Sequence, residues 1–72
     1  MTDAEWIALY AGRIGVEAPS EDEVTALLEL AGVAAHASQR TAAPIACWLA
    51  ARAGRTPAEA LELARGVAPS GA

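Results

Sequence analysis

The chain has 72 residues, a net charge of −4 from nine acidic and five basic side chains, and a single cysteine, Cys47. A domain this short buries only about 60% of the surface that its unfolded chain exposes, and one cysteine with one histidine can form neither an internal disulfide nor a structural zinc site. The five basic residues are arginines scattered along the chain, so we expect no nucleic-acid partner.

The composition favours an all-α fold in a reducing compartment. Alanine, the best helix former, supplies roughly a quarter of the residues, and phenylalanine is absent. The acidic start at residues 1–5 is unlike a signal peptide, and the longest uncharged stretch, residues 41–51, is too short to span a bilayer. With one unpaired thiol, these features predict a cytoplasmic protein without membrane association.

A capping box at Thr2 to Glu5 predicts the first helix, because the threonine and the glutamate each satisfy a backbone N–H of the first turn. The helix is expected from about Asp3 to Arg13, followed by Gly15 as its terminator. Its apolar face repeats at helical spacing and comprises Trp6, Leu9 and Tyr10, with Ile14 following.

A second capping box at residues 20–23 opens the longest predicted helix, from about Glu21 to Gln39 or Arg40. Its apolar arc is wide, which indicates a central helix touched from more than one side. Gly32 inside this helix costs about 1 kcal/mol relative to alanine. Either a neighbouring helix crosses close at Gly32, or the glycine is an accident of composition.

The segment from Arg40 to Pro44 is expected to break the chain, since proline disfavours helix at the residue before it. A third helix is then predicted from about Pro44 to Ala53, with Gly54 as its C-cap. A third capping box, residues 56–59 with proline at the first helical position, predicts a fourth helix over about 57–65.

The predicted architecture is a compact four-helix domain over residues 1–67, with short loops, no strand and a flexible tail at 68–72. Short loops favour antiparallel neighbours. The shared core is expected to comprise Leu27, Leu28, Ala31, Trp48, Leu49 and Leu61.

The residues with catalytic potential are few, so we expect neither an enzyme nor a bound cofactor or metal. Lysine is absent, no glycine-rich phosphate loop is present, and most acids fall in the first turns of helices, where they complement the dipole. Cys47 is surrounded in sequence by apolar residues and is interpreted as a small buried filler.

His36 is the one residue with two competing interpretations. It is predicted near the end of the second helix, sharing a face with Glu29 and Arg40. There, two donors can satisfy the last carbonyls or contact a partner; we favour the cap for His36 and the docking contact for Arg40. The candidate partner-binding residues are His36, Arg40, Thr41, Pro44 and Trp6, the last because tryptophan is enriched at binding hot spots.

The run Ala35-His36, Arg40 and Ala42-Ala43-Pro44, with Trp48-Leu49-Ala50 and Glu5-Trp6, resembles the domain-of-unknown-function family numbered 6457. The resemblance covers about residues 5–64. It departs from the family pattern at Gly32 and Thr41. It implies a domain that occurs alone or fused to a protein resembling the molybdenum-cofactor guanylyltransferase, mostly in actinobacteria.

These observations predict a non-catalytic helical accessory module that binds a protein partner or forms a homo-oligomer. The resemblance implies a role in molybdenum-cofactor maturation or on a molybdoenzyme. The alternative is a binder of a small anion or nucleotide-type ligand, gripped by His36 and Arg40, because arginine offers a rigid donor fork to such groups.

Overall fold

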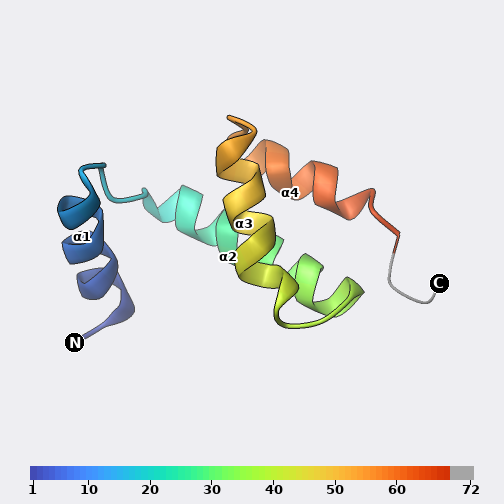
Figure 1. The fold of residues 1–72 in the computed structure, drawn as a ribbon, viewed down its shortest axis with the longest axis horizontal. Coiled ribbons are helices and arrows are strands. Elements are labelled where there is room, and N and C mark those ends of the chain that lie inside the picture. The colour runs from blue at the N-terminus through green and yellow to red at the C-terminus, as the bar shows by residue number, and fades with distance from the viewer. Residues whose placement is uncertain (69–72) are drawn as a thin grey trace.

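The computed structural model describes residues 1–68, which form four α-helices and no strand. The helices are α1 (Asp3–Ile14), α2 (Glu21–Ala37), α3 (Ala42–Arg52) and α4 (Pro57–Arg65), as Figure 1 shows. The prediction of an all-α domain with four helices and short loops is confirmed. Of the tail predicted at 68–72, all but Ala68 lies outside the described residues.

All three predicted capping boxes form, and they explain where α1, α2 and α4 begin. At α4, the backbone N–H of Thr56 donates to Glu59 at 2.9 Å, and the backbone N–H of Glu59 donates to the Thr56 hydroxyl at 3.2 Å. Each box therefore satisfies two N–H groups of a first turn that have no partner within the helix.

The capping boxes make the stability of the fold depend on pH. The backbone N–H of Thr56, followed by its hydroxyl, holds the pKa of Glu59 below its ordinary value of 4.5. A carboxylate with a lowered folded-state pKa stabilises the fold above its unfolded pKa and loses that contribution as the pH falls through the folded value. We therefore expect Glu59→Gln, which retains an oxygen that can accept the cap N–H, to be less sensitive to acid than the wild type below pH 4.5.

Chemical unfolding followed by circular dichroism, roughly from pH 6 to pH 3, measures this difference. Glu17→Gln, which removes an exposed carboxylate from the loop after α1, is the control for the loss of one negative charge. Identical pH profiles for Glu59→Gln and the wild type would show that the carboxylate does not make these hydrogen bonds in solution.

α3 begins at Ala42, two residues earlier than predicted, and without a side-chain cap. Pro44 therefore stands inside the first turn instead of opening the helix. This is tolerated because the first four N–H groups of a helix have no intrahelical acceptor, so the missing proton of proline breaks no bond.

α2 ends at Ala37, before the predicted end at Gln39 or Arg40. The hydroxyl of Ser38 donates to the carbonyl of Ala34 at 2.9 Å, and the backbone N–H of Ser38 donates to the same oxygen at 3.2 Å. The chain then turns back, and the N–H of Ala42 donates to the carbonyl of Gln39 at 2.9 Å. The expectation that His36 and Arg40 share a helical face is therefore wrong.

α2 is the central helix, as predicted, and packs against both α3 and α4 (Figure 1). Leu30, Ala60 and Leu61 form the buried core, and six partly buried side chains pack around it. These six are Leu27, Val33, Ala46, Cys47, Ala50 and Ala64.

The predicted core is right for Leu61 and for Leu27, and Ala31 is half-buried. It is wrong for Leu28, Trp48 and Leu49, which are 66%, 57% and 54% exposed. On α2, Leu27 and Leu30 pack in the core and leave Leu28 on the outside. On α3, the small residues Ala46, Cys47 and Ala50 pack against the core and the large residues point outward, because small side chains let two helix backbones approach closely.

Gly32 does not mark such a close approach. A β-carbon added there would meet no atom within 4 Å beyond its own helix, so the interpretation of a close helix crossing is wrong.

α1 stands apart from the other three helices and makes no helix-to-helix contact (Figure 1). On its inner side Ala11 is buried, and Ile7 lines a small cleft with Pro19 of the linker and Val24 at the start of α2. The short loop after α1 therefore does not give this helix an antiparallel neighbour. No helix within residues 1–68 is long and apolar enough to cross a membrane.

Candidate functional site

Four of the five predicted partner-binding residues lie around the turn between α2 and α3. His36 is in the last turn of α2, Arg40 and Thr41 are in the connecting turn, and Pro44 is in the first turn of α3; all four are exposed. Trp6 is 54% exposed on α1, which contacts none of the other helices, so the structure does not bring it to the other four.

The side chains of His36 and Arg40 do not cap α2 in the described part of the chain. The last turn is closed by Ser38 instead, through the hydroxyl and backbone bonds to Ala34. Glu29, expected on the face of His36, pairs with Arg65 of α4 at 3.3 Å. His36 stays in the last turn of α2, where a basic residue complements the helix dipole, but within residues 1–68 neither side chain donates to a carbonyl of α2. The partner-contact interpretation stays a prediction.

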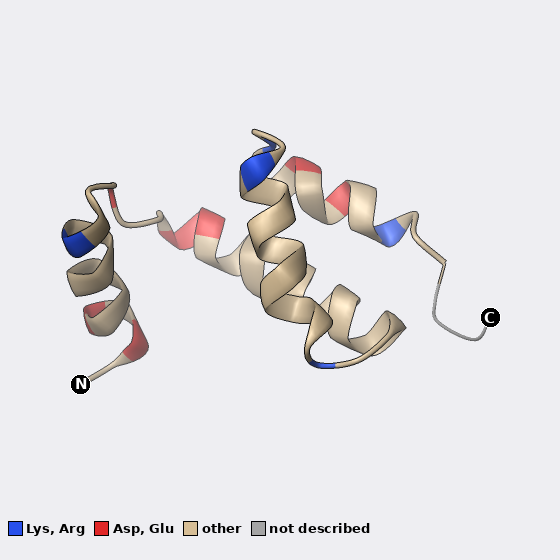
Figure 2. Cartoon of the chain, in the orientation of Figure 1, with Lys and Arg blue, Asp and Glu red and all other residues tan. Residues whose placement is uncertain are grey.

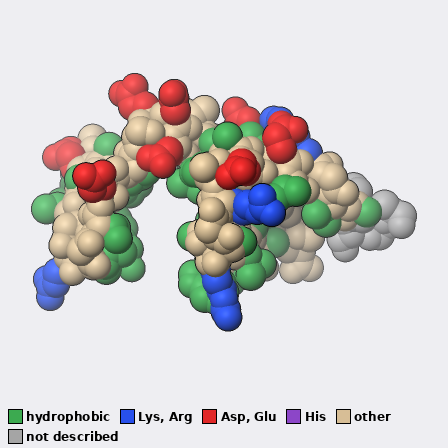
Figure 3. All heavy atoms as spheres, turned by 90° about the horizontal axis from the view of Figure 1, so that it is seen from above, with side chains coloured by type: hydrophobic (Ala, Val, Ile, Leu, Met, Phe, Trp, Pro, Cys, Tyr) green, Lys and Arg blue, Asp and Glu red, His purple; other side chains and the backbone are tan. Residues whose placement is uncertain are grey.

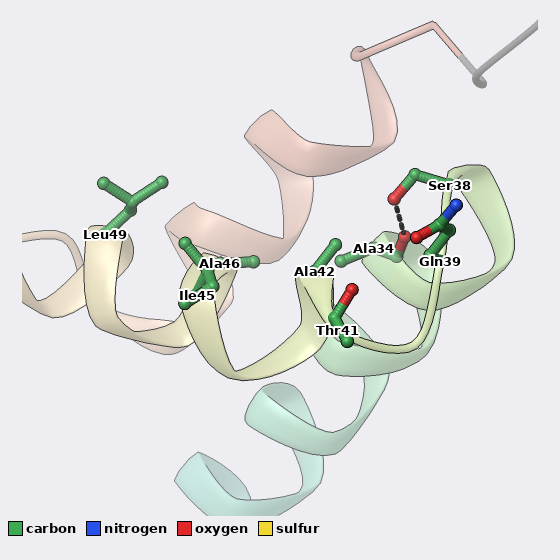
Figure 4. A pocket seen from close by; sticks show the side chains of 8 residues that line it. All are labelled: Ala34, Ser38, Gln39, Thr41, Ala42, Ile45, Ala46 and Leu49. Carbon is green, nitrogen blue, oxygen red and sulfur yellow. Dashed lines mark hydrogen bonds between the residues drawn. The ribbon is translucent and has the colours of Figure 1, made fainter.

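A shallow groove runs between the end of α2 and the outer side of α3 (Figure 4). Ser38, Gln39 and Thr41 supply its polar end. Its apolar lining consists of Ala34, Ala42, Ile45, Ala46 and Leu49. Of the predicted site residues only Thr41 lines it, and no arginine does, so the groove offers an anion none of the charge that the alternative function requires.

The outer face of α3 carries three large apolar side chains, which we call the α3 surface: Ile45, Trp48 and Leu49, exposed by 59%, 57% and 54%. The guanidinium carbon of Arg52 lies 5.0 Å from the centre of the Trp48 ring, within the range of a cation–π contact. A second groove continues from Leu49 toward Val67, beyond the end of α4. Sequence reasoning missed this surface because it assigned Trp48 and Leu49 to the core.

Cys47 is half-buried between α2 and α3. Its sulfur lies 4.0 Å from the carbonyl oxygen of Leu27, and burial raises the pKa of the thiol. A thiol that resists ionisation in a packed site fits the predicted role of a small filler. Within residues 1–68, no three acidic, cysteine or histidine side chains gather as a possible metal site.

The model of a family described as a domain of unknown function (DUF6457) matches residues 2–71. The chain belongs to this family. The match confirms the predicted family. Neither a curated protein nor a solved structure matches the chain.

Proposed function

We propose that this DUF6457 domain is a non-catalytic helical module that docks on a protein partner through the α3 surface. The observation that supports the proposal is the exposure of Trp48, with Ile45 and Leu49, on a helix whose small side chains face its own core. Contiguous exposed apolar side chains mark interaction sites, and buried tryptophans dominate the energy of many interfaces.

The surroundings of the α3 surface suit an interface with an apolar centre and a polar rim. Arg52 lies at one end of the surface, against the Trp48 ring. Near the other end of α3, His36 is exposed in the last turn of α2 and Arg40 is exposed in the turn that follows. In this proposal they donate hydrogen bonds to the partner at the rim of the interface. Their side chains are available for this role because they bind no other side chain within residues 1–68.

The partner class comes from the family resemblance alone. It implies a molybdenum-cofactor enzyme or a protein of cofactor maturation. We propose this class as the first to be tested, with the domain acting as an accessory part and the chemistry residing in the partner.

The test is capture of a partner from native lysate, followed by titration calorimetry with the purified partner. We expect Trp48→Ala to weaken binding by about 30-fold or more, the scale of a hot-spot tryptophan. Leu28→Ala is the matched control, because Leu28 is also exposed but lies on α2. Equal binding by Trp48→Ala, or no captured protein, would contradict the proposal, and unfolding curves would verify that both variants fold.

Arg40→Ala in the same titration tests whether Arg40 contacts the partner at the rim of the interface. A docking role predicts weaker binding at unchanged stability, since the Arg40 side chain holds no described part of the fold in place.

A further inference from the structure

The outward face of α1 is apolar and has nothing of its own chain against it. Trp6, Leu9 and Tyr10 are exposed by 54%, 64% and 51%, whereas another side of the helix borders the linker and the start of α2. The rings of Trp6 and Tyr10 stack with their centres 5.1 Å apart and their planes inclined by 22°. The two stacked rings form an exposed aromatic surface on α1.

The chain as a whole exposes more surface than a folded monomer of its mass. Its accessible area is 5599 Å², whereas the scaling law for monomers gives about 4,200 Å² for 7.3 kDa. The radius of gyration is 12.9 Å, against about 11 Å for a compact chain of this length. A standard interface removes about 800 Å² from each partner, which is less than the excess of the whole chain. The exposed Trp6, Leu9 and Tyr10 of α1 are part of that excess.

Charge on α1 is arranged so that the helix is complementary to itself. The spacing of three, four and three residues places Asp3, Trp6, Tyr10 and Arg13 along one side of the helix. Asp3 lies at the edge of this stripe, where it also borders the cleft on the inner side of α1, and its carboxylate accepts the backbone N–H of Ala4 at 2.7 Å. Figure 2 shows the acidic residues at the N-terminal end of α1 and the arginine at its C-terminal end. Arg13 makes no ion pair within residues 1–68.

We propose that a second copy of this chain covers α1, with the two α1 helices packed antiparallel about a twofold axis. In this register Trp6 of one copy lies against Tyr10 of the other, and Arg13 lies against Asp3. Both contacts then occur twice, as an isologous interface requires. The antiparallel arrangement also opposes the two helix dipoles.

The negative net charge opposes self-association, so the position of the acidic side chains relative to the proposed contact matters. Most of the acids lie outside α1, over the start of α2 and along α4 (Figure 2). Figure 3 shows the acidic side chains along one edge of the molecule and most of the hydrophobic side chains away from that edge. Most of the acidic side chains therefore lie away from the proposed contact. This contact is separate from the α3 surface, and the proposal of a dimer does not depend on the proposed function.

The first test is sedimentation equilibrium of the full chain over a range of concentrations. We expect a species of twice 7.3 kDa that dissociates on dilution, and about 30-fold or more weaker association for Trp6→Ala. Trp48→Ala, which removes a tryptophan of similar exposure from α3, should dimerise like the wild type. A monomer at all concentrations, including one in which α1 folds back on its own α3, overturns the proposal.

The second test fixes the register by charge exchange. Asp3→Arg and Arg13→Asp should each weaken the dimer, and the double variant should restore it, because the pair is re-formed in reversed order. The rescue cannot come from helix stability, since the double variant keeps an unfavourable arginine in the first turn and an aspartate in the last. Glu17→Arg is the control for a change of net charge. Absence of rescue would overturn the antiparallel register.

The outcomes for the two proposals are distinguishable. A monomeric chain that still binds a partner through Trp48 refutes only the α1 dimer, and a dimer with no partner refutes only the proposed function.

Discussion

Replacing Leu30 with alanine is expected to lower the free energy of unfolding by about 2–5 kcal/mol. Leu30 is 2% exposed and lies on the central helix, packed with Ala60 and Leu61 of α4. Truncation removes buried apolar area and leaves a cavity where α2 meets α4. Small domains have only about 5–15 kcal/mol of stability, so this one side chain supplies a large part of it.

The matched control is Leu28→Ala, in the same helix and with the same change in helix propensity. Leu28 is 66% exposed, so its truncation should change the stability by less than about 0.5 kcal/mol. Equilibrium unfolding in denaturant, followed by circular dichroism, measures both variants. A comparable loss for Leu28→Ala would show that α2 is rotated in solution or that a partner covers this side chain.

The helices could be predicted from the sequence because their start signals are local. Each capping box involves residues three apart, whose hydrogen bonds form within one turn whatever surrounds them. The starts of α1, α2 and α4 at Asp3, Glu21 and Pro57 follow directly. The start of α3 was displaced because a proline can occupy any position of a first turn, so Pro44 alone does not set the boundary.

The core was predicted less well than the helices, because tertiary packing decides which side of each helix is buried. The apolar arc of α2 holds Leu27, Leu28 and Leu30, and the sequence pattern does not say which part of the arc the other helices cover. On α3 we assigned the large side chains inward. The structure instead packs Ala46, Cys47 and Ala50 there, because a small-residue face brings two helices close.

For the candidate partner-binding residues, the structure agrees with their predicted exposure but not with their predicted geometry. The turn between α2 and α3 does carry exposed His36, Arg40, Thr41 and Pro44. The donor pair on one helical face does not exist, because Ser38 bonds back to the carbonyl of Ala34 and ends the helix before Arg40. A serine near a helix end can make this bond, and it was the signal in the sequence that could have corrected the boundary.

Replacing Gly54 with alanine is expected to destabilise the fold by about 1–2 kcal/mol, through the backbone alone. Gly54 has φ of +72° just after α3, a conformation in which a side chain crowds the following carbonyl. A β-carbon there would meet no other atom within 4 Å, so no steric contact with the rest of the chain contributes to the loss. Chemical unfolding measures the effect.

Two further variants separate this backbone cost from other causes. Gly54→Asn should lose less than Gly54→Ala, because asparagine adopts the left-handed conformation more readily. Gly32→Ala should raise stability by up to about 1 kcal/mol, since Gly32 lies inside α2 with open space around it. Glycine-to-alanine substitution is then expected to lower the stability at Gly54 and to raise it at Gly32. Neither added β-carbon would meet another atom within 4 Å, so the sign of the change in stability depends on the backbone conformation. A destabilising Gly32→Ala would instead show that another helix, from this chain or a partner, lies against α2 in solution.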